Sequence, residues 1–291
     1  MAKIWCLGSI NIDLFYRVPH LPAPGETLAA LDHDRGLGGK GANQSVAASK
    51  AGAQVYHIGC IGASSDWIIE RLQSFGVDTT FLRVVDEPTG HAIINVDQSG
   101  ENSIVIYPGA NIGLNTGQFE AAIASARAGD ILLMQNETNL QTESARIAAE
   151  KGMRVFYSAA PFDAKAVEQV IPYLDALLMN EIESQQLSDA TGSSLMDLPI
   201  DNIVVTHGER GARWLKTTDR QEIVSPGIKV RAVDTTGAGD TFAGYLAASV
   251  AAGQKPQQAI ETATRAAALK VTKRGTADAI PTYSEVQAFS A

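Results

Sequence analysis

Short apolar runs alternate with stretches of helical spacing along most of the chain. The runs are short enough for strands, which we predict at Ile4–Leu7, Val55–Ile61, Ile131–Met134, Arg154–Tyr157, Ala176–Met179 and Ile203–Thr206. Helical spacing predicts helices at Lys40–Ala51, Trp67–Phe75, Thr142–Lys151 and Ala164–Tyr173. Strands that alternate with helices predict an α/β fold, in which a mostly parallel sheet carries helices on both faces.

Two stretches interrupt this alternation. Residues 14–31 contain Pro19, Pro22, Pro24 and Gly25, and residues 91–107 alternate around a Ser99-Gly100 turn that is typical of a β-hairpin. We expect both to form a small β-sheet that projects as a lid from a single domain spanning residues 1–291. An antiparallel edge of the main sheet is the alternative.

Composition and charge narrow the class of protein. Of the 291 residues, 45% are hydrophobic and 19% charged, as in soluble globular proteins. The net charge of −9 argues against a nucleic-acid-binding protein, which typically carries a basic patch or stripe on its surface. Cys6 and Cys60 form no disulfide framework, and no apolar run approaches the length of a transmembrane helix. We therefore expect a cytoplasmic protein that binds neither nucleic acid nor membranes.

The segment richest in chemistry is Asp234–Gly244, where a glycine-rich turn leads into a helix expected at Thr241–Ala252. Backbone N–H groups of residues 237–239 converge at the start of such a helix, where unpaired amides and the helix dipole bind anions. Asp240 stands at the helix start, placed to accept a proton from a substrate hydroxyl. The alternative is an aspartate that only caps the helix.

Two further segments carry polar residues near predicted turns. Gly36–Ser45 lacks the spacing of a Walker phosphate loop, but close backbone approach and the Asn43 amide suit a polyhydroxylated ligand. In Gly8–Asp13, Asn11 and Asp13 share one face of an extended chain and can hydrogen-bond neighbouring hydroxyls. The alternatives are a tight turn before a packed helix and a solvated strand end.

Polar residues also follow three later strands. They are Glu137, the pair Asn180 and Glu183, and the segment Thr206–Gly211. Ligands of open α/β sheets bind beyond the carboxyl ends of the strands. Asn180 and Glu183 can hold a hydrated Mg²⁺ through oxygen atoms and water. Thr206–Gly211 is either a contact for nucleotide phosphates or a hairpin turn.

Motifs of other enzyme classes are missing from the sequence. It contains no G-x-S-x-G and no H-E-x-x-H, which argues against a serine hydrolase and a zinc protease. Gly8-Ser-Ile-Asn after the first strand does not supply the G-x-G-x-x-G of a nucleotide-binding dehydrogenase.

Taken together, these segments resemble the ribokinase (PfkB) family of carbohydrate kinases. The likeness runs from Gly8 to about Pro281 and includes both family signatures, Gly38–Asn43 and Asp234–Asp240. Gly8–Asp13 and the pair Glu101-Asn102 are most similar to the ribokinase branch. The resemblance implies a three-layer αβα sandwich, with a small lid sheet that also clasps a homodimer.

The resemblance also implies a reaction. ATP would donate its γ-phosphate to a primary hydroxyl of a small sugar, and the expected reaction converts D-ribose to ribose 5-phosphate. The alternatives are another pentose, a keto-sugar or a nucleoside as substrate, or a non-catalytic protein that binds a sugar or nucleotide with the same fold.

Roles for individual residues follow from the same resemblance. Asp240 would be the catalytic base, and Gly237, Ala238 and Gly239 the anion hole for the transferred phosphoryl group. The sugar hydroxyls would be held by Asn11, Asp13, Gly39, Lys40, Asn43 and Glu137. Nucleotide and Mg²⁺ would be bound by Asn180, Glu183, Thr206, Gly208, Gly211 and Thr264. A monovalent cation, K⁺, would lie beside the anion hole, with ligands from Asp234, Thr236, Lys270, Lys273 and Gly275, the last three through backbone carbonyls.

The chain departs from the family pattern at several positions. Ser158–Pro161 replaces an Asn-Pro-Ala-Pro segment, and the stretch between Glu183 and Ile203 is short. Thr264 stands where an Asn or His often contacts adenine. Ala279 stands where a serine oxygen often helps to hold the cation. The last two departures bear on nucleotide affinity and on dependence on K⁺.

Overall fold

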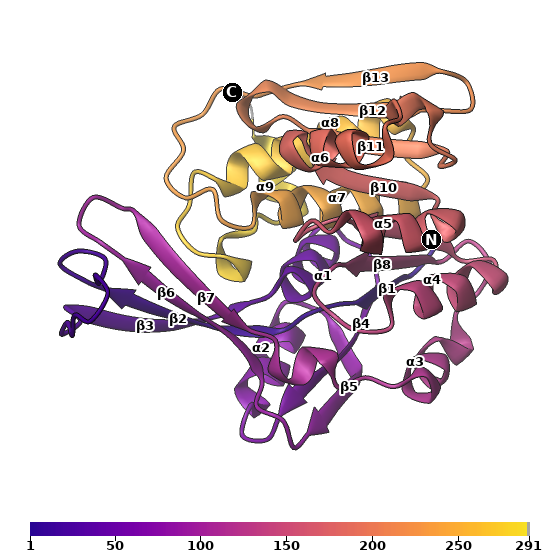
Figure 1. Ribbon diagram of the computed structural model, residues 1–291. Helices are drawn as coiled ribbons and strands as arrows, with labels where there is room; N and C mark the ends of the chain where they lie inside the picture. The colour runs from indigo at the N-terminus through magenta and orange to yellow at the C-terminus, as the bar shows by residue number, and fades with distance from the viewer. Residues whose placement is uncertain (290–291) are drawn as a thin grey trace.

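The computed structural model describes residues 1–289. Its main body is a nine-stranded sheet. In spatial order the strands are β13 (Gln221–Pro226), β12 (Gly211–Lys216), β11 (Asn202–Thr206), β10 (Ala176–Asn180), β9 (Arg154–Ser158), β8 (Ile131–Gln135), β1 (Ile4–Leu7), β4 (Val55–Gly62) and β5 (Asp78–Val85). Figure 1 shows them stacked from β13 at the top to β5 at the bottom. All pair in parallel except β12 and β13, which are antiparallel at one edge.

Helices cover both faces of this sheet. One layer consists of α1 (Lys40–Lys50), α2 (Asp66–Ser74), α7 (Ala238–Ala251) and α8 (Pro256–Lys270), with α9 (Tyr283–Ala288) against α8. The other consists of α3 (Thr116–Ala122), α4 (Gln141–Glu150), α5 (Ala164–Val170) and α6 (Glu181–Thr191). The expected three-layer αβα sandwich with a mostly parallel sheet is confirmed.

The alternation of side chains along each strand divides the core into two apolar clusters. In β1, Ile4 and Cys6 belong to the cluster under α1 and α7, whereas Trp5 and Leu7 belong to the cluster under α3–α6. Successive side chains of a strand point to opposite faces, so a strand covered on both sides is apolar throughout. This is why the central strands are visible in the sequence as continuous apolar runs.

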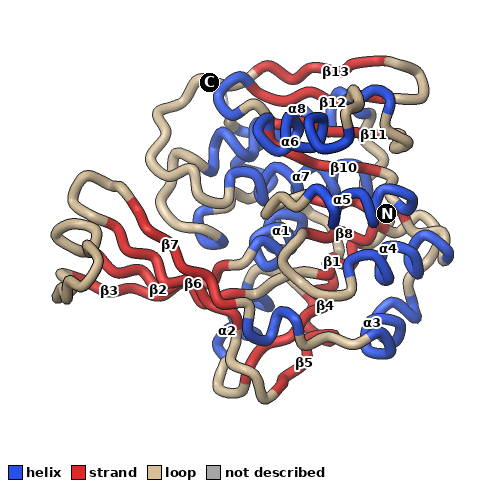
Figure 2. The backbone as a smooth tube through the Cα atoms, viewed as in Figure 1, coloured by secondary structure: helices blue, strands red, loops and turns tan. Residues whose placement is uncertain are grey.

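A second sheet of four strands stands apart from the main one. It is made of β3 (Asp32–Gly38), β2 (Asn11–Arg17), β6 (Gly90–Val96) and β7 (Asn102–Tyr107), in that order. It projects from the body at the left of Figure 1 and Figure 2. The predicted turn joins β6 to β7, with Gly100 at φ 89°. Because this sheet is separate, the alternative of an antiparallel edge of the main sheet is wrong.

The small sheet is larger than the apolar pattern indicates. Its strand β3 begins with four exposed residues, Asp32–Arg35, and therefore carries almost no apolar signal. Pairing with β2 along seven residues makes it a strand. Likewise, the pattern does not indicate the edge strands β5 and β13, the strand β12 between β13 and β11, or the helices α3, α6 and α8, because their apolar faces are interrupted by polar residues.

Helix α1 is in backbone contact with two other elements. A Cβ at Gly244 of α7 would lie 2.5 Å from the Gln44 carbonyl and from the Ala47 side chain. At the start of α1, the backbone of Gly41 lies against that of Gly8, with no room for a side chain on either residue. These contacts hold the first turn of α1 between the end of β1 and the start of α7.

We predict that Gly244→Ala destabilises the protein by about 1–3 kcal/mol, because the added methyl group overpacks the α1–α7 contact. Urea unfolding measures the change. The matched control is Gly117→Ala in α3, where a Cβ has an ordinary neighbour at 3.6 Å. There the helix should gain about 0.5–1 kcal/mol. Equal effects of the two substitutions would contradict the packing argument.

Candidate active site

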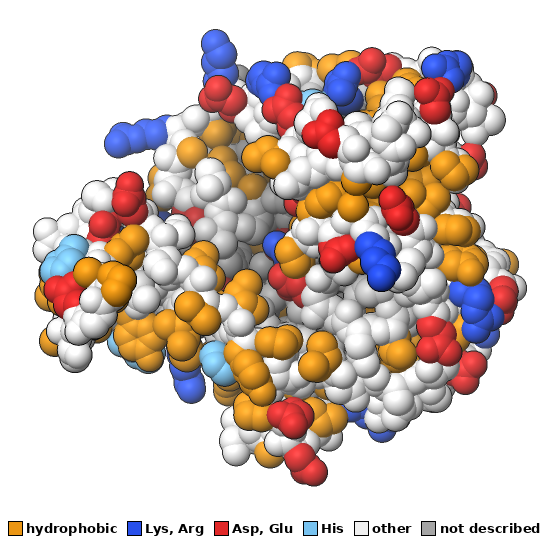
Figure 3. Space-filling model, in the orientation of Figure 1, with side chains coloured by type: hydrophobic (Ala, Val, Ile, Leu, Met, Phe, Trp, Pro, Cys, Tyr) orange, Lys and Arg blue, Asp and Glu red, His pale blue; other side chains and the backbone are white. Residues whose placement is uncertain are grey.

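The polar residues singled out in the sequence converge beyond the carboxyl ends of β1 and β8. The first turns of α1 and α7 meet there, and the small sheet stands in front of them. Figure 3 shows a hollow between the small sheet and the main body, with charged side chains at its edge. This is the edge at which open α/β sheets bind ligands.

The Asp240 carboxylate is held by two amides from α1. Asn43 Nδ2 donates to Asp240 Oδ2 and Gln44 Nε2 donates to Asp240 Oδ1, both at 3.1 Å. All three side chains are buried. With one donor on each oxygen, the carboxylate has a defined orientation at the first turn of α7.

A buried glutamine extends this hydrogen-bonded chain to strand β8. Gln135, at the end of β8, donates through Nε2 to Gln44 Oε1 at 2.8 Å. A carboxylate can only accept, so Gln44 must turn its nitrogen to Asp240 and its oxygen to Gln135. Strand β8 thereby orients the carboxylate through α1.

Ser9 anchors Glu137 beside the same helix. The Ser9 hydroxyl donates to Glu137 Oε2 and accepts from the Gly41 N–H at 3.2 Å. The same carboxylate oxygen accepts from the Lys40 N–H at 3.1 Å. Gly39 precedes this turn with φ 91°, and a Cβ there would lie 2.8 Å from backbone atoms of Ser9 and Asn11, so only glycine fits.

Asn11 and Asp13 share one face of β2, as predicted, and both are buried. Asn11 Oδ1 accepts from Asn111 Nδ2 at 2.8 Å, and Asn111 Oδ1 accepts from the Ile10 N–H at 2.8 Å. The Asp13 carboxylate lies over Gly38 of β3, where a side chain would collide with it. The small sheet therefore contributes polar groups to the hollow.

Burial and neighbouring charges shift the pKa values of Asp13 and Lys40. Burial raises the pKa of Asp13 to about 7, and the negative charges of Glu137 and Asp240 add to the shift. Burial lowers the pKa of the Lys40 ammonium, but three surrounding carboxylates outweigh it and leave the pKa above its ordinary value. They belong to Asp240, Glu137 and Glu183. One cation thus stands among several carboxylates.

Two buried acceptors in this cluster, Asn43 Oδ1 and Gln135 Oε1, have no partner among residues 1–289. Asn43 Oδ1 belongs to the side chain whose nitrogen holds Asp240. A buried carbonyl oxygen without a donor is costly, and a ligand hydroxyl would satisfy it. The donor and acceptor groups around it suit a polyhydroxylated ligand.

The glycine-rich turn before α7 opens toward the hollow. Gly237 has φ 70°, and nothing lies within 4 Å of the position of a Cβ at Gly239. The Ala238 N–H donates to the Thr235 carbonyl at 3.2 Å, so an anion would have to take over this bond. The space beside Gly239 leaves a ligand free to approach the helix N-terminus.

Residues predicted for the nucleotide lie on neighbouring strand ends. Asn180 and Thr206 are paired between β10 and β11. Asn180 and Glu183 form a capping box at the start of α6, with bonds of 2.9 and 2.8 Å. Burial raises the pKa of Glu183, opposed by the Asn180 N–H and by Lys40. Gly208 and Gly211 both have positive φ in the turn that joins β11 to β12.

Thr264 does not join this group through its side chain. It is buried in α8, and its hydroxyl donates to the Ile260 carbonyl one turn earlier at 2.8 Å. The hydroxyl is thereby engaged within its own helix. Among the described residues, no hydrogen bond joins the Thr264 side chain to Thr206, Gly208 or Gly211.

The residues predicted to bind a monovalent cation form a compact hydrogen-bonded cluster. Asp234 Oδ2 accepts from the Gly275 N–H and Oδ1 from the Thr236 N–H, both at 2.9 Å. The Lys270 ammonium donates to the Asp234 carbonyl at 3.1 Å, and the Lys273 N–H donates to the Lys270 carbonyl at 3.0 Å. Asp234, Thr236, Lys270, Lys273 and Gly275 therefore do come together.

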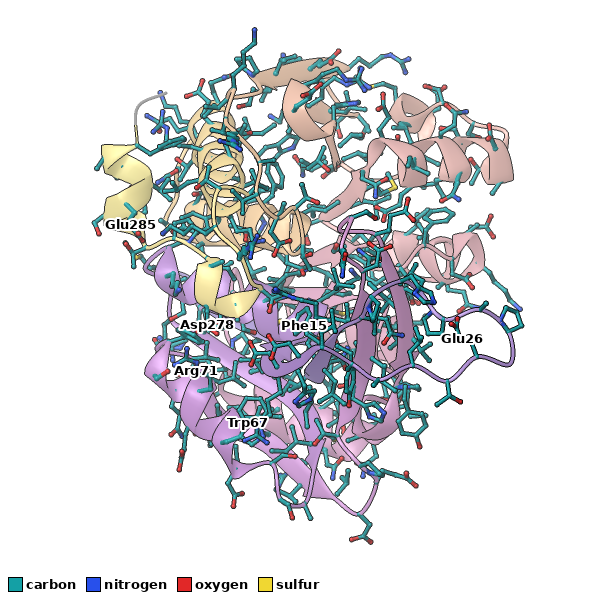
Figure 4. All side chains as sticks on the ribbon, turned by 90° about the vertical axis from the view of Figure 1, so that its left-hand side faces the viewer. Phe15, Glu26, Trp67, Arg71, Asp278 and Glu285 are labelled. Atoms are coloured by element: carbon teal, nitrogen blue, oxygen red, sulfur yellow. The ribbon has the colours of Figure 1, made fainter. Side chains whose placement is uncertain are left out.

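The loop of residues 276–280, which follows this cluster, is held to the main body by hydrogen bonds and an ion pair. Thr276 donates to the Leu37 carbonyl at 2.8 Å and Lys50 to the Ile280 carbonyl at 2.6 Å. Arg71 of α2 pairs with Asp278, and Figure 4 shows the two side chains near Trp67, below the C-terminal segment. The loop is thus held close to α1, α2 and β3.

This cluster offers an incomplete set of oxygen ligands for a cation. The Lys270 and Asp234 oxygens already accept hydrogen bonds, and Ala279 offers no side-chain oxygen. The buried Lys270 ammonium already brings a positive charge to Asp234. The residues present therefore do not fit a bound K⁺ well. Among residues 1–289, no group of three or more His, Cys, Asp or Glu side chains could hold a metal ion.

Four residues of the site were not singled out from the sequence. They are Ser9, Gln44, Asn111 and Gln135, each buried and hydrogen-bonded to a predicted residue or its neighbour. Ser9 and Gln44 lie inside the two segments already quoted, so adjacency was an available signal. Gln135 stands two residues before Glu137, so the same signal was available for it. Asn111 is 100 residues away from its partner Asn11, and nothing in a single sequence connects the two.

Comparison with known proteins defines the class to which this site belongs. The model of the pfkB family of carbohydrate kinases matches residues 1–283, so the chain belongs to that family. It is a phosphotransferase that acts on a sugar. No helix of residues 1–289 is long and apolar enough to cross a membrane.

Individual relatives cover nearly the whole chain. A ribokinase of Haemophilus influenzae is 36% identical, over 97% of this chain and 96% of its own. A deoxyribokinase of Salmonella typhimurium is 32% identical, over 97% of both chains. The structure of Arabidopsis thaliana ribokinase complexed with ribose and ATP is 28% identical and superposes with a TM-score of 0.88, covering 100% of both chains.

We predict that Asp13 makes stability depend on pH when no ligand is bound. Its pKa is about 7 in the folded protein and 3.8 in the unfolded chain, so the folded state binds the proton more tightly. The stabilising contribution is complete below pH 4 and is lost as the pH rises through 7. Between pH 5 and pH 8 this carboxyl should cost about 3 kcal/mol.

The Asp13→Asn variant should lose much of this pH dependence and become more stable than the parent protein at pH 8. Urea unfolding at pH 5 and pH 8 measures the difference. The control is Asp86→Asn, which removes an exposed carboxyl. Parallel pH profiles of the parent and Asp13→Asn would refute the perturbed carboxyl.

Proposed function

We propose that this protein transfers the γ-phosphate of ATP to the primary hydroxyl of D-ribose and releases ribose 5-phosphate and ADP. The observation that carries the proposal is the oriented Asp240 carboxylate, at the start of α7 and within one cluster with Asp13, Lys40, Asn43 and Glu137. It is supported by the ribokinases among the relatives, one of them bound to ribose and ATP.

In this mechanism the polar cluster holds the sugar. Asn11, Asp13, Lys40, Asn43 and Glu137 are the groups that bind its hydroxyls, together with the backbone of Gly39. Asn43 Oδ1 gains the donor that it lacks. Since the cluster mixes one cation with several acceptors, it can match donors and acceptors on neighbouring hydroxyls. Binding energy is thereby used to position the reacting hydroxyl.

Asp240 then accepts the proton of the primary hydroxyl. The hydroxyl oxygen forms a bond to the γ-phosphorus as the bond between that phosphorus and the β–γ bridging oxygen breaks, and ADP leaves. The amides of Gly237, Ala238 and Gly239 and the N-terminus of α7 stabilise the charge on the transferred group. In such a reaction positioning and charge stabilisation supply most of the rate.

Asn180, Glu183, Thr206, Gly208 and Gly211 line the nucleotide side in this proposal, with Thr264 a packing residue of the adjoining helix. Asn180 and Glu183 would hold Mg²⁺ through water, since Glu183 keeps one oxygen outside the capping box. Bound Mg²⁺ would neutralise charge on the phosphates. No step of the proposed reaction depends on a bound monovalent cation.

The small sheet acts as a lid in this proposal, and the whole chain works as one kinase domain. Asn11 and Asp13 lie on the lid and Asp240 on the body, so closure would bring sugar-binding groups and base together and exclude water. We place the enzyme in the cytoplasm, where ATP is abundant. Both buried cysteines, Cys6 and Cys60, are free thiols, as expected of a reducing compartment.

A second sugar is favoured by one observation. The deoxyribokinase relative is 32% identical to this chain, close to the values for several ribokinases. 2-Deoxy-D-ribose is therefore the strongest alternative substrate, ahead of a keto-sugar or a nucleoside. A site that hydrogen-bonds the 2-hydroxyl discriminates against the sugar that lacks it.

We also propose that two copies associate through the lid. All six residues of β7 are exposed, including four large apolar side chains in a row from Ile104 to Tyr107. On the face turned away from Asp13, Leu14, Ile93 and Val105 stand side by side across β2, β6 and β7. Figure 3 shows apolar side chains gathered on this sheet. An apolar row of this kind suits burial against a second copy.

With Mg-ATP, we predict that ADP is released fastest with D-ribose, in a panel that also contains 2-deoxy-D-ribose, D-fructose and adenosine. We expect kcat/KM for ribose to exceed that for deoxyribose at least about tenfold. A higher value for another member would move the substrate to that member. Folded protein without turnover on any of them would favour the binding-protein alternative.

In the same assay, Asp240→Asn should lower kcat by about 10²–10⁴-fold, the usual contribution of a positioned base. Ribose affinity, measured by calorimetry, should change little. Glu137→Gln is the comparison and should weaken ribose binding more than it lowers kcat. Retained turnover in Asp240→Asn would eliminate this residue as the base.

For the lid contact, Val105→Lys should convert a dimer to a monomer, because it places a charge in the apolar row. Sedimentation equilibrium measures the mass. Val224→Lys is the matched control, since Val224 is a similarly exposed valine on the edge strand of the main sheet. A dimer that persists in Val105→Lys would exclude this face.

A further inference from the structure

Lys270 is the one lysine whose side chain is among the largest fully buried ones of the protein. It is the last residue of α8, and its ammonium donates to the main-chain carbonyl of Asp234. Among residues 1–289 it forms no ion pair with a carboxylate within hydrogen-bonding reach. One carbonyl does not offset the burial of a full charge, so this ammonium is held at a cost in stability.

The charge lies at the base of the anion-binding turn. Val233 and Asp234 both donate to the Val271 carbonyl, at 2.7 and 3.1 Å, so the two segments run together. Asp234 is three residues before Gly237, where the turn into α7 begins. Burial lowers the pKa of the Lys270 ammonium, and the carboxylates of Asp234 and Asp240, which lie on either side of the turn, oppose this shift.

A second residue that bears on the cation site supports the same interpretation. Ala279 supplies no side-chain oxygen for a cation, and Lys270 supplies a positive charge beside Asp234. The ammonium therefore places one positive charge in this cluster without a bound ion. The C-terminus of α8 also favours a cation at this position.

We propose that the Lys270 ammonium is a built-in cation, which takes over the electrostatic role of a bound monovalent ion beside the anion-binding turn. It steadies the Asp234–Gly239 backbone and adds positive potential where the transferred phosphoryl group gathers negative charge. Lys270 touches neither substrate in this proposal and is a positioning residue. The proposal rests on the proposed kinase function.

The test compares the parent protein with Lys270→Met, which keeps an unbranched buried side chain and removes the charge. Lys255→Met is the matched control, because it removes an exposed lysine just before the same helix. All are assayed in KCl and in N-methyl-D-glucamine chloride at equal ionic strength. Thermal unfolding and calorimetric binding of Mg-ADP are measured in the same buffers.

We expect the parent protein to respond to K⁺ less than about twofold in kcat, with a melting-temperature shift below about 1 °C. Lys270→Met should remain folded, lose kcat at least about tenfold and bind Mg-ADP more weakly, since the turn loses its charge. Lys255→Met should behave like the parent. A purely structural lysine would change the melting temperature without changing Mg-ADP affinity.

Two results would overturn the proposal. One is strong activation of the parent protein by K⁺ with a K⁺-specific rise in melting temperature, because a working ion site would then exist. The other is unchanged kcat and Mg-ADP affinity in folded Lys270→Met. A lack of turnover with every sugar would instead refute the proposed function, because the unfolding and Mg-ADP measurements need no turnover.

Discussion

The active site depends on how closely helix α1 approaches its neighbours. Gly41 lies against Gly8 at one end, and Gly244 lets α7 cross α1 at the other. Only because these backbones touch can Asn43 and Gln44 reach the Asp240 carboxylate, which belongs to a different helix nearly 200 residues later at separations of 197 and 196. A methyl group at either crossing would overpack it, so the backbones could no longer lie this close.

The site also stores electrostatic cost. Burial raises the pKa of Asp13, and the charges of Glu137 and Asp240 add to the shift. Burial opposes the charged form of Lys40, but the surrounding carboxylates leave its pKa raised. Without ligand, such an arrangement works against folding. Functional sites commonly keep such costs, because the groups that repel one another in the free protein are the ones that a ligand pairs. Asn43 Oδ1, buried without a donor, has the same character.

Much of the fold is predictable from the sequence. Among the strands covered on both faces, β1 is apolar throughout and β8 is apolar from Ile131 to Met134. Gly52 and Gly76 follow the helices α1 and α2. The predicted site residues follow strand ends, where parallel topology gathers them. The pattern misses β3, because its exposed residues carry no apolar signal and only pairing with β2 makes it a strand. It also misses Asn111, whose partner Asn11 is 100 residues away in the sequence.

By itself, the sequence determined the layers of the sandwich, the turns that need glycine and the residues able to do chemistry. Those properties are local, since strand periodicity, φ preference and side-chain chemistry need no distant partner. Only the tertiary structure decided that Gln135 orients Asp240 through Gln44, that Asp13 is a perturbed acid and that Lys270 is buried against Asp234. Each of these depends on burial and on distances between remote segments, and both quantities exist only after the chain has packed.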